Sequence, residues 1–368
     1  MKKVLRVVTR LNVGGPSKQI LTLDSLFDED EYEQIIVAGR VLESEIEIEL
    51  YHFGRVIKLD ELRRGLNPIN DIKAVLQLMV IIKNYKPDII HTHLSKAWAV
   101  TTLARLFIRS KSKSIHTFHG HVLHSYFSKP TVWILTGIQK ILAGYTDVLI
   151  AVNPIVRDEL IQKGIGSASE FVVIYPGFDA CATIPKALAR FNLGLNPKGL
   201  VIGYIGRFEQ IKRPDILAEV VKTISALDVD VQFLICGGGS LYSKFQESTR
   251  DDKVRCLGWI KNVTEFYSAI DLLILTSDNE GSPLAIIEAG LVGIPTLSRN
   301  VGGINSLIQG NFNGFLSGDT SFDITEMLQS ILLDSYLLQN VSRNVRIDFN
   351  LRFNATDFLQ KHAAVYSG

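Results

Sequence analysis

The sequence predicts an α/β protein with two doubly wound domains, each built on a mainly parallel sheet. Its 368 residues exceed the length over which one hydrophobic core usually grows, so two domains of roughly 150 to 200 residues are expected. Short runs rich in β-branched residues alternate with longer stretches of helical periodicity, which is typical of parallel sheets covered by helices. A segment containing prolines and glycines, residues 180–199, interrupts this alternation and separates two sets of strands.

In chain order, seven strands are expected in the first set and five in the second. The first set covers residues 4–11, 32–40, 56–59, 87–94, 114–120, 147–153 and 171–177. The second set covers residues 200–208, 231–239, 253–260, 271–277 and 294–300. We therefore expect a first domain at residues 1–183 and a second at residues 184–347. The remaining residues, 348–368, are amphipathic, and we expect a helix that docks on one of the domains, with the first as our choice.

Positive and negative charges are nearly equal in number over the whole chain but are unevenly distributed along the sequence. The 39 Lys and Arg residues against 38 Asp and Glu give a net charge of +1, which argues against a general nucleic-acid-binding protein. From Lys73 to Lys140, however, all the charged residues are basic except Asp88. This stretch has two interpretations: ordinary solvated helix faces, or a surface for an anionic partner.

Cysteine content and hydropathy are typical of a protein in a reducing cytoplasm. Cys181, Cys236 and Cys256 lie far apart and form no Cys-x-x-Cys pair, so neither a disulfide framework nor a cysteine zinc site is expected. Arginines interrupt the apolar run near the N-terminus, which we therefore interpret as a buried strand and not as a signal peptide. The most apolar candidate for a membrane span, residues 132–145, is too short.

Two carboxylates flank a predicted helix start in the second domain. Ser282 is a favourable N-cap and Pro283 a favourable first helical residue, so we expect a helix that starts at Pro283 and contains Glu288. Glu280 then lies in the preceding loop, and both carboxylates can line one pocket. The unpaired N–H groups and the positive dipole end of a helix start attract phosphate. This arrangement suits an elongated ligand in which a sugar, a diphosphate and a ribose lie in line.

A basic pair precedes this motif in the same domain. Arg207 and Lys212 lie in a turn that follows the strand ending near Gly206. Arg binds phosphate oxygens in a bidentate manner, and Lys adds a compact charge. Alone, such a pair is more often a surface feature, but its place in the domain that holds Glu280 favours a diphosphate site.

These motifs resemble those of the family 4 glycosyltransferases. Residues 206–212, GRFEQIK, resemble the Gly-Arg-x4-Lys element of that family, and Glu280 to Glu288 resemble its Glu-x7-Glu element. Residues 256–295 and 301–316 follow the same pattern. In the first half, similarity to bacterial enzymes that build capsule, O-antigen or exopolysaccharide repeat units is found at residues 10–19, 87–97, 116–127 and 150–160. The resemblance covers nearly the whole chain.

The resemblance implies the GT-B fold, in which two Rossmann-like domains face a cleft. It implies a hexosyl- or N-acetylhexosaminyltransferase that retains the anomeric configuration and needs neither a metal ion nor another cofactor. The nucleotide sugar would bind the second domain and the acceptor the first. We expect a UDP-sugar as the donor, with a GDP-sugar as the alternative, and a lipid-linked saccharide or another oligosaccharide as the acceptor.

The resemblance also implies roles for individual residues. Arg207 and Lys212 would bind the donor diphosphate and Glu288 the ribose hydroxyls. Glu280 and His119 would lie beside the donor sugar. Our candidate catalytic residues are therefore His119, Glu280, Arg207 and Lys212. The further candidates are Gly14 and Gly15 of a flexible loop near the diphosphate, Gly281, Ser282, Pro283 and Leu284 on the donor side, and His93, Lys96 and His121 on the acceptor side.

Some positions depart from the family pattern and leave donor selectivity open. Arg213 stands where the family usually has Gly, which adds a charge near the phosphate turn, and Ile211 stands where Glu is common. Residues 298–300 and 302–306 lack the usual Asp and Glu. Asn-Pro at 153–154 replaces a Ser-Glu or Ser-Pro type of pair, and residues 175–179 replace a Pro-Asn-Gly-x-Asp run.

A histidine cluster supports a competing hypothesis, a metal-dependent hydrolase. The cluster consists of His91, His93, His116, His119, His121 and His124. A His-x-His pair at a strand end begins many metal sites, but such sites take further His and Asp ligands from later strands, and the second half contains only His362. We therefore interpret most of these histidines as structural. A nucleotide-sugar 2-epimerase with the GT-B fold is a further alternative, which the Arg-x4-Lys and Glu-x7-Glu elements disfavour.

The acceptor side suggests a membrane partner. The basic stretch from Lys73 to Lys140 accompanies apolar runs at residues 122–127 and 132–135, a combination that suits an anionic lipid surface. We therefore expect peripheral contact with the inner face of the cytoplasmic membrane. The alternative is a soluble acceptor and a purely structural apolar run.

Overall fold

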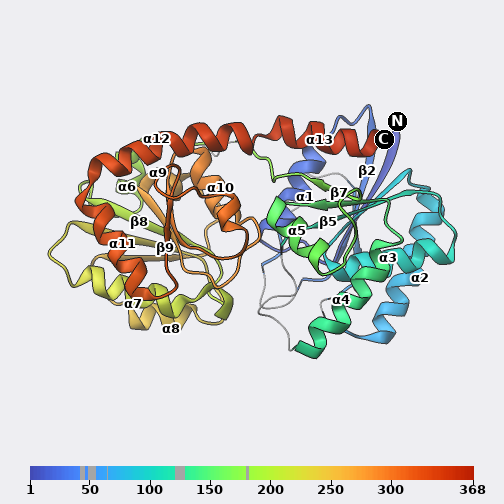
Figure 1. Cartoon of the computed structure of the whole chain (residues 1–368), viewed down its shortest axis with the longest axis horizontal. Helices are drawn as coiled ribbons and strands as arrows, with labels where there is room; N and C mark the ends of the chain where they lie inside the picture. Colours follow the sequence, from blue (N-terminus) through green and yellow to red (C-terminus); the bar gives the residue numbers. More distant parts are fainter. Residues whose placement is uncertain (42–45, 49–54, 64, 121–128, 180–181) are drawn as a thin grey trace. The chain divides into compact units, whose positions relative to one another are not determined.

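The computed structural model describes the chain except for residues 42–45, 49–54, 64, 121–128 and 180–181 (Figure 1). It divides into two compact units. Unit 1 comprises Met1–Phe178 together with Ala355–Gly368, and unit 2 comprises Asp179–Asn354. The first part of unit 1 ends at Phe178 and unit 2 ends at Asn354, whereas the sequence led us to expect domain limits at residues 183 and 347. No helix in the described part of the chain combines the length and the apolar character needed to cross a bilayer.

The described residues of unit 1 form a seven-stranded parallel sheet in the order β3-β2-β1-β4-β5-β6-β7. Its strands are β1 (Lys2–Val8), β2 (Tyr32–Gly39), β3 (Arg55–Leu59), β4 (Ile89–His93), β5 (Lys113–Phe118), β6 (Val148–Ala151) and β7 (Phe171–Val173). Its helices are α1 (Gly15–Leu26), α2 (Pro68–Tyr85), α3 (Ser95–Phe107), α4 (Lys129–Ala143), α5 (Pro154–Gln162) and α13 (Ala355–Ser367). All seven expected strands are therefore present.

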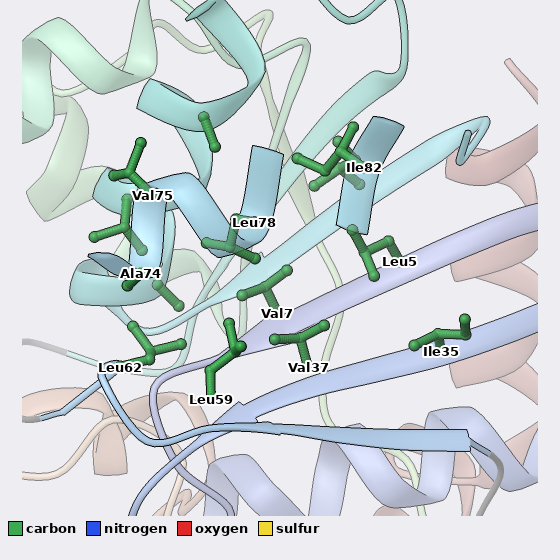
Figure 2. Packing of buried hydrophobic residues seen from close by; sticks show 14 residues of the cluster. Leu5, Val7, Ile35, Val37, Leu59, Leu62, Ala74, Val75, Leu78 and Ile82 are labelled. Carbon is green, nitrogen blue, oxygen red and sulfur yellow. The ribbon is translucent and has the colours of Figure 1, made fainter. Parts of the chain in front are cut away.

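Alternation along β1 explains why both faces of this sheet are covered. Leu5 and Val7 join a core formed with α2 and α3, in which Leu78 and Ile82 of α2 point toward the strand (Figure 2). Val4, whose side chain points to the opposite face, packs in a second core with residues of α1 and α13. The apolar residues of β1 cover both faces of the strand, and Arg6, which interrupts them, is buried and pairs with Asp24 of α1 at 2.8 Å.

Two helix starts of unit 1, those of α2 and α5, follow from short capping signals. Asn67 precedes Pro68, and its side chain accepts a hydrogen bond from the Asn70 N–H at 3.1 Å. Asn153 caps α5 in the same manner, at 2.8 Å from the Val156 nitrogen. The Asn-Pro pair that departs from the family pattern therefore keeps the capping function, because Asn and Ser are comparable N-cap residues.

The described residues of unit 2 form a six-stranded parallel sheet in the order β10-β9-β8-β11-β12-β13. Its strands are β8 (Leu200–Ile205), β9 (Val231–Cys236), β10 (Val254–Gly258), β11 (Leu272–Leu275), β12 (Thr296–Arg299) and β13 (Phe315–Ser317). Its helices are α6 (Lys186–Asn192), α7 (Pro214–Ser225), α8 (Tyr242–Ser248), α9 (Thr264–Ala269), α10 (Leu284–Leu291), α11 (Ser321–Leu333) and α12 (Ser335–Arg352), with short 3₁₀ turns η1 (Gln210–Lys212) and η2 (Gly302–Ser306). The five expected strands are present, and β13 is an additional strand that we did not predict.

The C-terminal residues form two helices instead of the single tail helix that we expected. Helix α12 continues to Arg352 within unit 2, and α13 begins at Ala355 within unit 1. Phe358, Val365 and Tyr366 of α13 fill the core on the α1 face of the first sheet. The docking on the first unit agrees with our expectation, whereas the position of the helix start does not.

Both sheets reverse their strand order at one point, and this locates the candidate sites. In unit 1 the reversal lies between β1 and β4, and in unit 2 it lies between β8 and β11. Ligands of open α/β sheets bind outside the carboxyl ends of the strands at such a switch point. The loops that follow β1 and β4, and those that follow β8 and β11, are therefore the places where binding residues should gather.

Candidate active site

The two loops at the switch point of unit 2 carry the basic pair and Glu280. Arg207 and Lys212 follow β8, and Glu280 follows β11. Hydrogen bonds join the loops: the Asp278 N–H donates to the Ile211 carbonyl at 2.9 Å, and the Thr276 hydroxyl donates to the Lys212 carbonyl at 2.9 Å. Residues far apart in the sequence are thus held at the same end of the sheet.

Lys212 and Glu280 form an ion pair, which the sequence did not predict. The Glu280 carboxylate also accepts a hydrogen bond from the Ser277 hydroxyl at 2.7 Å, and its side chain is only 9 % exposed. The Lys212 side chain is 20 % exposed, so its ammonium group is reached from solvent more readily than the carboxylate. The lysine that we assign to phosphate therefore already has an anionic partner.

The guanidinium of Arg207 has a different environment. Arg207 is partly buried, and its side chain makes no hydrogen bond or ion pair with any residue that the structure describes. Its carbonyl accepts a hydrogen bond from the Tyr204 hydroxyl at 3.3 Å. A bidentate phosphate ligand would satisfy this guanidinium without displacing another group.

Helix α10 begins one residue later than expected. Its first residue is Leu284, and Pro283 occupies the N-cap position in an extended conformation without a side-chain cap. Ser282, our expected N-cap, lies before it in the loop. Proline was favoured at the first helical position, but here its ψ of 121° is extended, so the helix starts after it. No acidic residue occupies the first turn, which leaves the helix start suitable for an anion.

Glu288 lies inside α10, as expected, and is 8 % exposed. Its carboxylate accepts a hydrogen bond from the Tyr267 hydroxyl at 2.8 Å. Tyr267 comes from α9, and sequence reasoning assigned it no role. Because Glu280 precedes the helix start and Glu288 follows it, the two carboxylates flank that start in the manner that the sequence suggested.

The turn η2 contacts the backbone of Glu280, although sequence analysis assigned this turn no role. The Gly303 N–H donates to the Glu280 carbonyl at 2.8 Å. Gly302 has a φ of +52°, and a Cβ at this position would lie 2.4 Å from the same carbonyl oxygen. Both the left-handed backbone and the close approach therefore require glycine. The motif was visible in the sequence, but only the structure shows what it contacts.

Arg213 adds a charge near the phosphate turn, and the structure shows that this charge is paired. It has a φ of +50°, a conformation that favours glycine and explains why glycine is usual at this position. Its guanidinium pairs with Asp215 at 2.7 Å and with Asp278 at 3.2 Å. These partners raise the pKa of Arg213, and Arg213 lowers the pKa of the Asp215 carboxyl. Asp278 also pairs with the buried Arg299 at 2.5 Å, so this charge is locally balanced.

The glycine candidates of unit 1 lie at its own switch point, after β1. Gly15 is the first residue of α1, so only Gly14 belongs to the loop, and our expectation of a loop containing both was wrong for Gly15. Gly14 has an extended backbone with φ 159° and ψ 172°, and a Cβ there would contact nothing within 4 Å. The first turn of α1 carries no acid.

His93 and His119 are adjacent at the carboxyl ends of β4 and β5. The Nδ1 atom of His93 lies 3.0 Å from Nε2 of His119, so one ring donates a hydrogen bond to the other. Burial lowers the pKa of His119 to about 3 and that of His93 well below its ordinary value. Both rings are therefore neutral near pH 7. Together with Thr117 and His362 they border a small cavity within unit 1.

The remaining acceptor-side candidates have different outcomes. Lys96 pairs with Asp71 of α2 at 2.5 Å and donates to the Gly65 carbonyl at 2.8 Å, so its ammonium group is already engaged within unit 1. His121 lies outside the described residues, as does His124. A wide recess in unit 2, bordered by residues such as Arg250 and Asp252, contains none of our candidates.

Two members of the histidine cluster, His91 and His116, have structural hydrogen-bond partners. Both ring nitrogens of His91 are hydrogen-bonded, to the Tyr366 hydroxyl and the Thr117 hydroxyl, each at 2.7 Å. His116 bonds to Thr92 and stacks on Trp98 with ring centroids 4.1 Å apart. Among the residues that the structure describes, no group of three or more His, Cys, Asp or Glu side chains could hold a metal ion. His91 and His116 are structural histidines, as we expected of most members of the cluster.

The folds of known proteins agree with this architecture. The structure resembles that of Anabaena HepE in complex with UDP and glucose, with a TM-score of 0.82 and 19 % sequence identity over 100 % of both chains. Two Rossmann-like parallel sheets, one in each unit, define the GT-B fold.

Comparison of sequences assigns the family. Residues 13–180 match the family described as Glycosyltransferase Family 4, and residues 185–348 match the one described as Glycosyl transferases group 1. The chain is 28 % identical to the Escherichia coli UDP-Gal:alpha-D-GlcNAc-diphosphoundecaprenol alpha-1,3-galactosyltransferase, over 85 % of this chain and 83 % of that protein. It is 22 % identical to the Staphylococcus aureus capsular polysaccharide biosynthesis glycosyltransferase CapM, over 83 % of both. The chain therefore belongs to the family 4 glycosyltransferases and resembles members of capsule and O-antigen biosynthesis.

Proposed function

We propose that this glycosyltransferase moves a hexose or N-acetylhexosamine from a UDP-sugar to a hydroxyl of a lipid-linked saccharide, with retention of configuration. The observation that carries the proposal is the ion pair of Lys212 with Glu280, which joins the loop that also holds Arg207 to the loop before α10, the helix of Glu288, at the switch point of unit 2. One of the relatives named above uses UDP-Gal and a diphosphoundecaprenol-linked sugar, and HepE binds UDP. These names support the choice of base and of acceptor class.

The donor diphosphate is the group for which this site is best suited. Arg207 offers an uncommitted guanidinium, and the start of α10 offers N–H groups and a positive dipole end. Lys212 supplies a third positive charge once the diphosphate competes with Glu280 for it. Glu288, held by Tyr267, accepts hydrogen bonds from the ribose hydroxyls.

In the proposed reaction, the bond between the anomeric carbon and the β-phosphate oxygen breaks, and its electron pair stays on that oxygen. The acceptor hydroxyl forms the new bond on the same face of the sugar, and its proton passes to the departing phosphate oxygen. Arg207, Lys212 and the helix start stabilise the negative charge that develops on the diphosphate. No metal ion is required in this scheme. A contact of His119 with the donor sugar stays a prediction.

Nucleotide binding is the first test of this proposal. Purified protein is screened by thermal shift and calorimetry against UDP, GDP, ADP and their common sugar conjugates. A ligand at about 100 times its Kd stabilises the folded state by about 2.7 kcal/mol, so modest affinity is measurable. We expect a response to UDP that Glu288→Ala removes and that Glu326→Ala, an exposed change on α11, leaves intact.

The outcomes separate this proposal from the alternatives. No response to any nucleotide would refute it. Formation of an altered nucleotide sugar from the donor alone, followed by NMR, would indicate the epimerase. Transfer to a water-soluble oligosaccharide as fast as to a lipid-linked saccharide would refute the acceptor class but keep the transferase.

A further inference from the structure

Helix α2 of unit 1 is apolar on two opposite faces, and only one of them is covered. Its inner face carries Leu78 and Ile82, which pack in the core (Figure 2). Its outer face carries Ile69, Ile72, Leu76 and Val80, whose side chains are between 54 and 69 % exposed. Steps of three and four residues place these four side chains in one stripe along the helix.

Helix α4 repeats this pattern. Trp133, Ile134, Ile138 and Ile141 are between 42 and 79 % exposed and occupy its outer side. Its inner side contributes Leu142 and Ala143 to the core. Scattered exposed apolar residues need no explanation, but two regular stripes on helices of one layer do.

The two stripes belong to the same side of unit 1. Helix α3 contacts both α2 and α4, so the three helices lie side by side. The exposed Leu106 and Phe107 at the end of α3 add apolar surface between the outer helices. We call the exposed sides of α2, α3 and α4 the apolar surface.

The charges along this layer identify the partner. Lys73 and Lys83 are exposed within the α2 stripe, and Lys140 is exposed on α4. Of the nearby acids, Asp71 pairs with Lys96 at 2.5 Å, and Asp88 keeps its charge while it accepts a hydrogen bond from the Lys3 N–H at 2.8 Å. With Lys73, Lys83 and Lys140 exposed, the outer side of the layer therefore combines apolar side chains with net positive charge.

We propose that the apolar surface docks unit 1 on an anionic lipid bilayer, with the α2 and α4 stripes buried at the boundary between headgroups and acyl chains. Amphipathic helices that lie in the membrane plane have this combination of an apolar face and lysines. A second copy of the chain fits less well, because its surface would place the same lysines opposite one another. Docking itself follows from the surface alone, while its use, access to a lipid-linked acceptor, rests on the proposed function.

Sedimentation with vesicles tests the docking. The full chain is mixed with vesicles of phosphatidylcholine containing 30 % phosphatidylglycerol, and with pure phosphatidylcholine, at low and high salt. We expect binding to the anionic vesicles that falls about fivefold for each lysine removed in Lys73→Gln and Lys83→Gln at low salt. The double change Trp133→Ser, Ile134→Ser should reduce binding about tenfold or more, because two large apolar side chains no longer enter the lipid.

A matched control distinguishes docking through the apolar surface from nonspecific adsorption to vesicles. Phe191→Ser alters a side chain that is 80 % exposed on α6 of unit 2, and it should leave vesicle binding unchanged. The inference is overturned if the wild-type chain fails to sediment with anionic vesicles, or if Phe191→Ser costs as much binding as the α4 change. It is also overturned if ultracentrifugation shows a dimer that the α4 change dissociates while vesicles are not bound.

Calorimetry with UDP on the same variants keeps the two proposals distinct. Vesicle binding without UDP binding would refute the proposed function and support the docking surface. UDP binding that is equal in all variants, combined with loss of vesicle binding in the α4 variant, would support both.

Discussion

The pairing of Lys212 with Glu280 leads to a prediction in which two substitutions in one ion pair have opposite effects. The diphosphate and the Glu280 carboxylate compete for the same ammonium group. Lys212→Ala removes that group, so UDP should bind more weakly and transfer should slow by about 10²-fold to 10³-fold, the cost of losing one preorganised charge donor. Glu280→Gln removes the competitor, so UDP should bind more tightly even though turnover falls.

The magnitude for Glu280→Gln follows from the burial of the pair. Lys212 is 20 % exposed and Glu280 is 9 % exposed, so the interaction is stronger than that of an open surface pair, which is typically worth up to about 1 kcal/mol. Glutamine can keep the hydrogen bond from Ser277. Loss of the competing carboxylate should therefore improve the binding free energy of UDP by at least about 1 kcal/mol, which corresponds to a Kd that is at least about fivefold lower.

Calorimetric titration with UDP and initial rates of transfer measure the two effects. Lys222→Ala on α7 is the matched control, because this lysine is exposed and lies outside the site. If Glu280→Gln weakens UDP binding as much as Lys212→Ala does, the two residues do not compete and the reasoning is refuted. Full turnover by Lys212→Ala would refute the assignment of this lysine to the diphosphate site.

Three further predictions concern stability. Gly302→Ala should lower the free energy of unfolding in urea by about 2 kcal/mol or more, because it adds left-handed strain to a clash with a backbone carbonyl, whereas Gly310→Ala, which meets open space, should be nearly neutral. Tyr267→Phe leaves the buried Glu288 without this donor and should cost about 1 to 2 kcal/mol by the same assay; an unchanged midpoint would show that another donor replaces it. Burial lowers the pKa of His362 to about 4, below its unfolded value, so the stability of the folded state should fall as the pH drops from about 6.5 toward 4. His362→Gln should flatten that slope by about 1.4 kcal/mol per pH unit, and an unchanged slope would contradict the burial argument.

Much of the architecture was predictable because its signals are local. Buried parallel strands need continuous apolar runs, and every expected run became a strand. The strand β13, Phe315–Ser317, was not predicted because it is short and directly follows residues 310–314, GNFNG, whose glycines and asparagines are typical of a turn. The positions of Glu280 in a loop and Glu288 in a helix were likewise predictable from the neighbouring Ser and Pro, although the helix start moved to Leu284.

The contacts of the site could not be predicted, because they join residues that no local rule relates. The pairing of Lys212 with Glu280 depends on two loops that meet only when β8 and β11 lie side by side. The partners of Arg213 depend on its left-handed backbone, which the sequence does not reveal for an arginine. Tyr267 reaches Glu288 from a neighbouring helix, and a tyrosine in a short apolar helix gives no sign of that role.

The return of α13 to unit 1 has a consequence for the order in which the chain folds during synthesis. Unit 2 is one continuous segment, Asp179–Asn354, and all its strands have left the ribosome before α13 is made. The core on the α1 face of unit 1 stays incomplete until Phe358, Val365 and Tyr366 arrive. The half of the protein that is translated first is therefore the half that finishes last, and until α13 arrives the incomplete core on the α1 face leaves apolar surface open to aggregation.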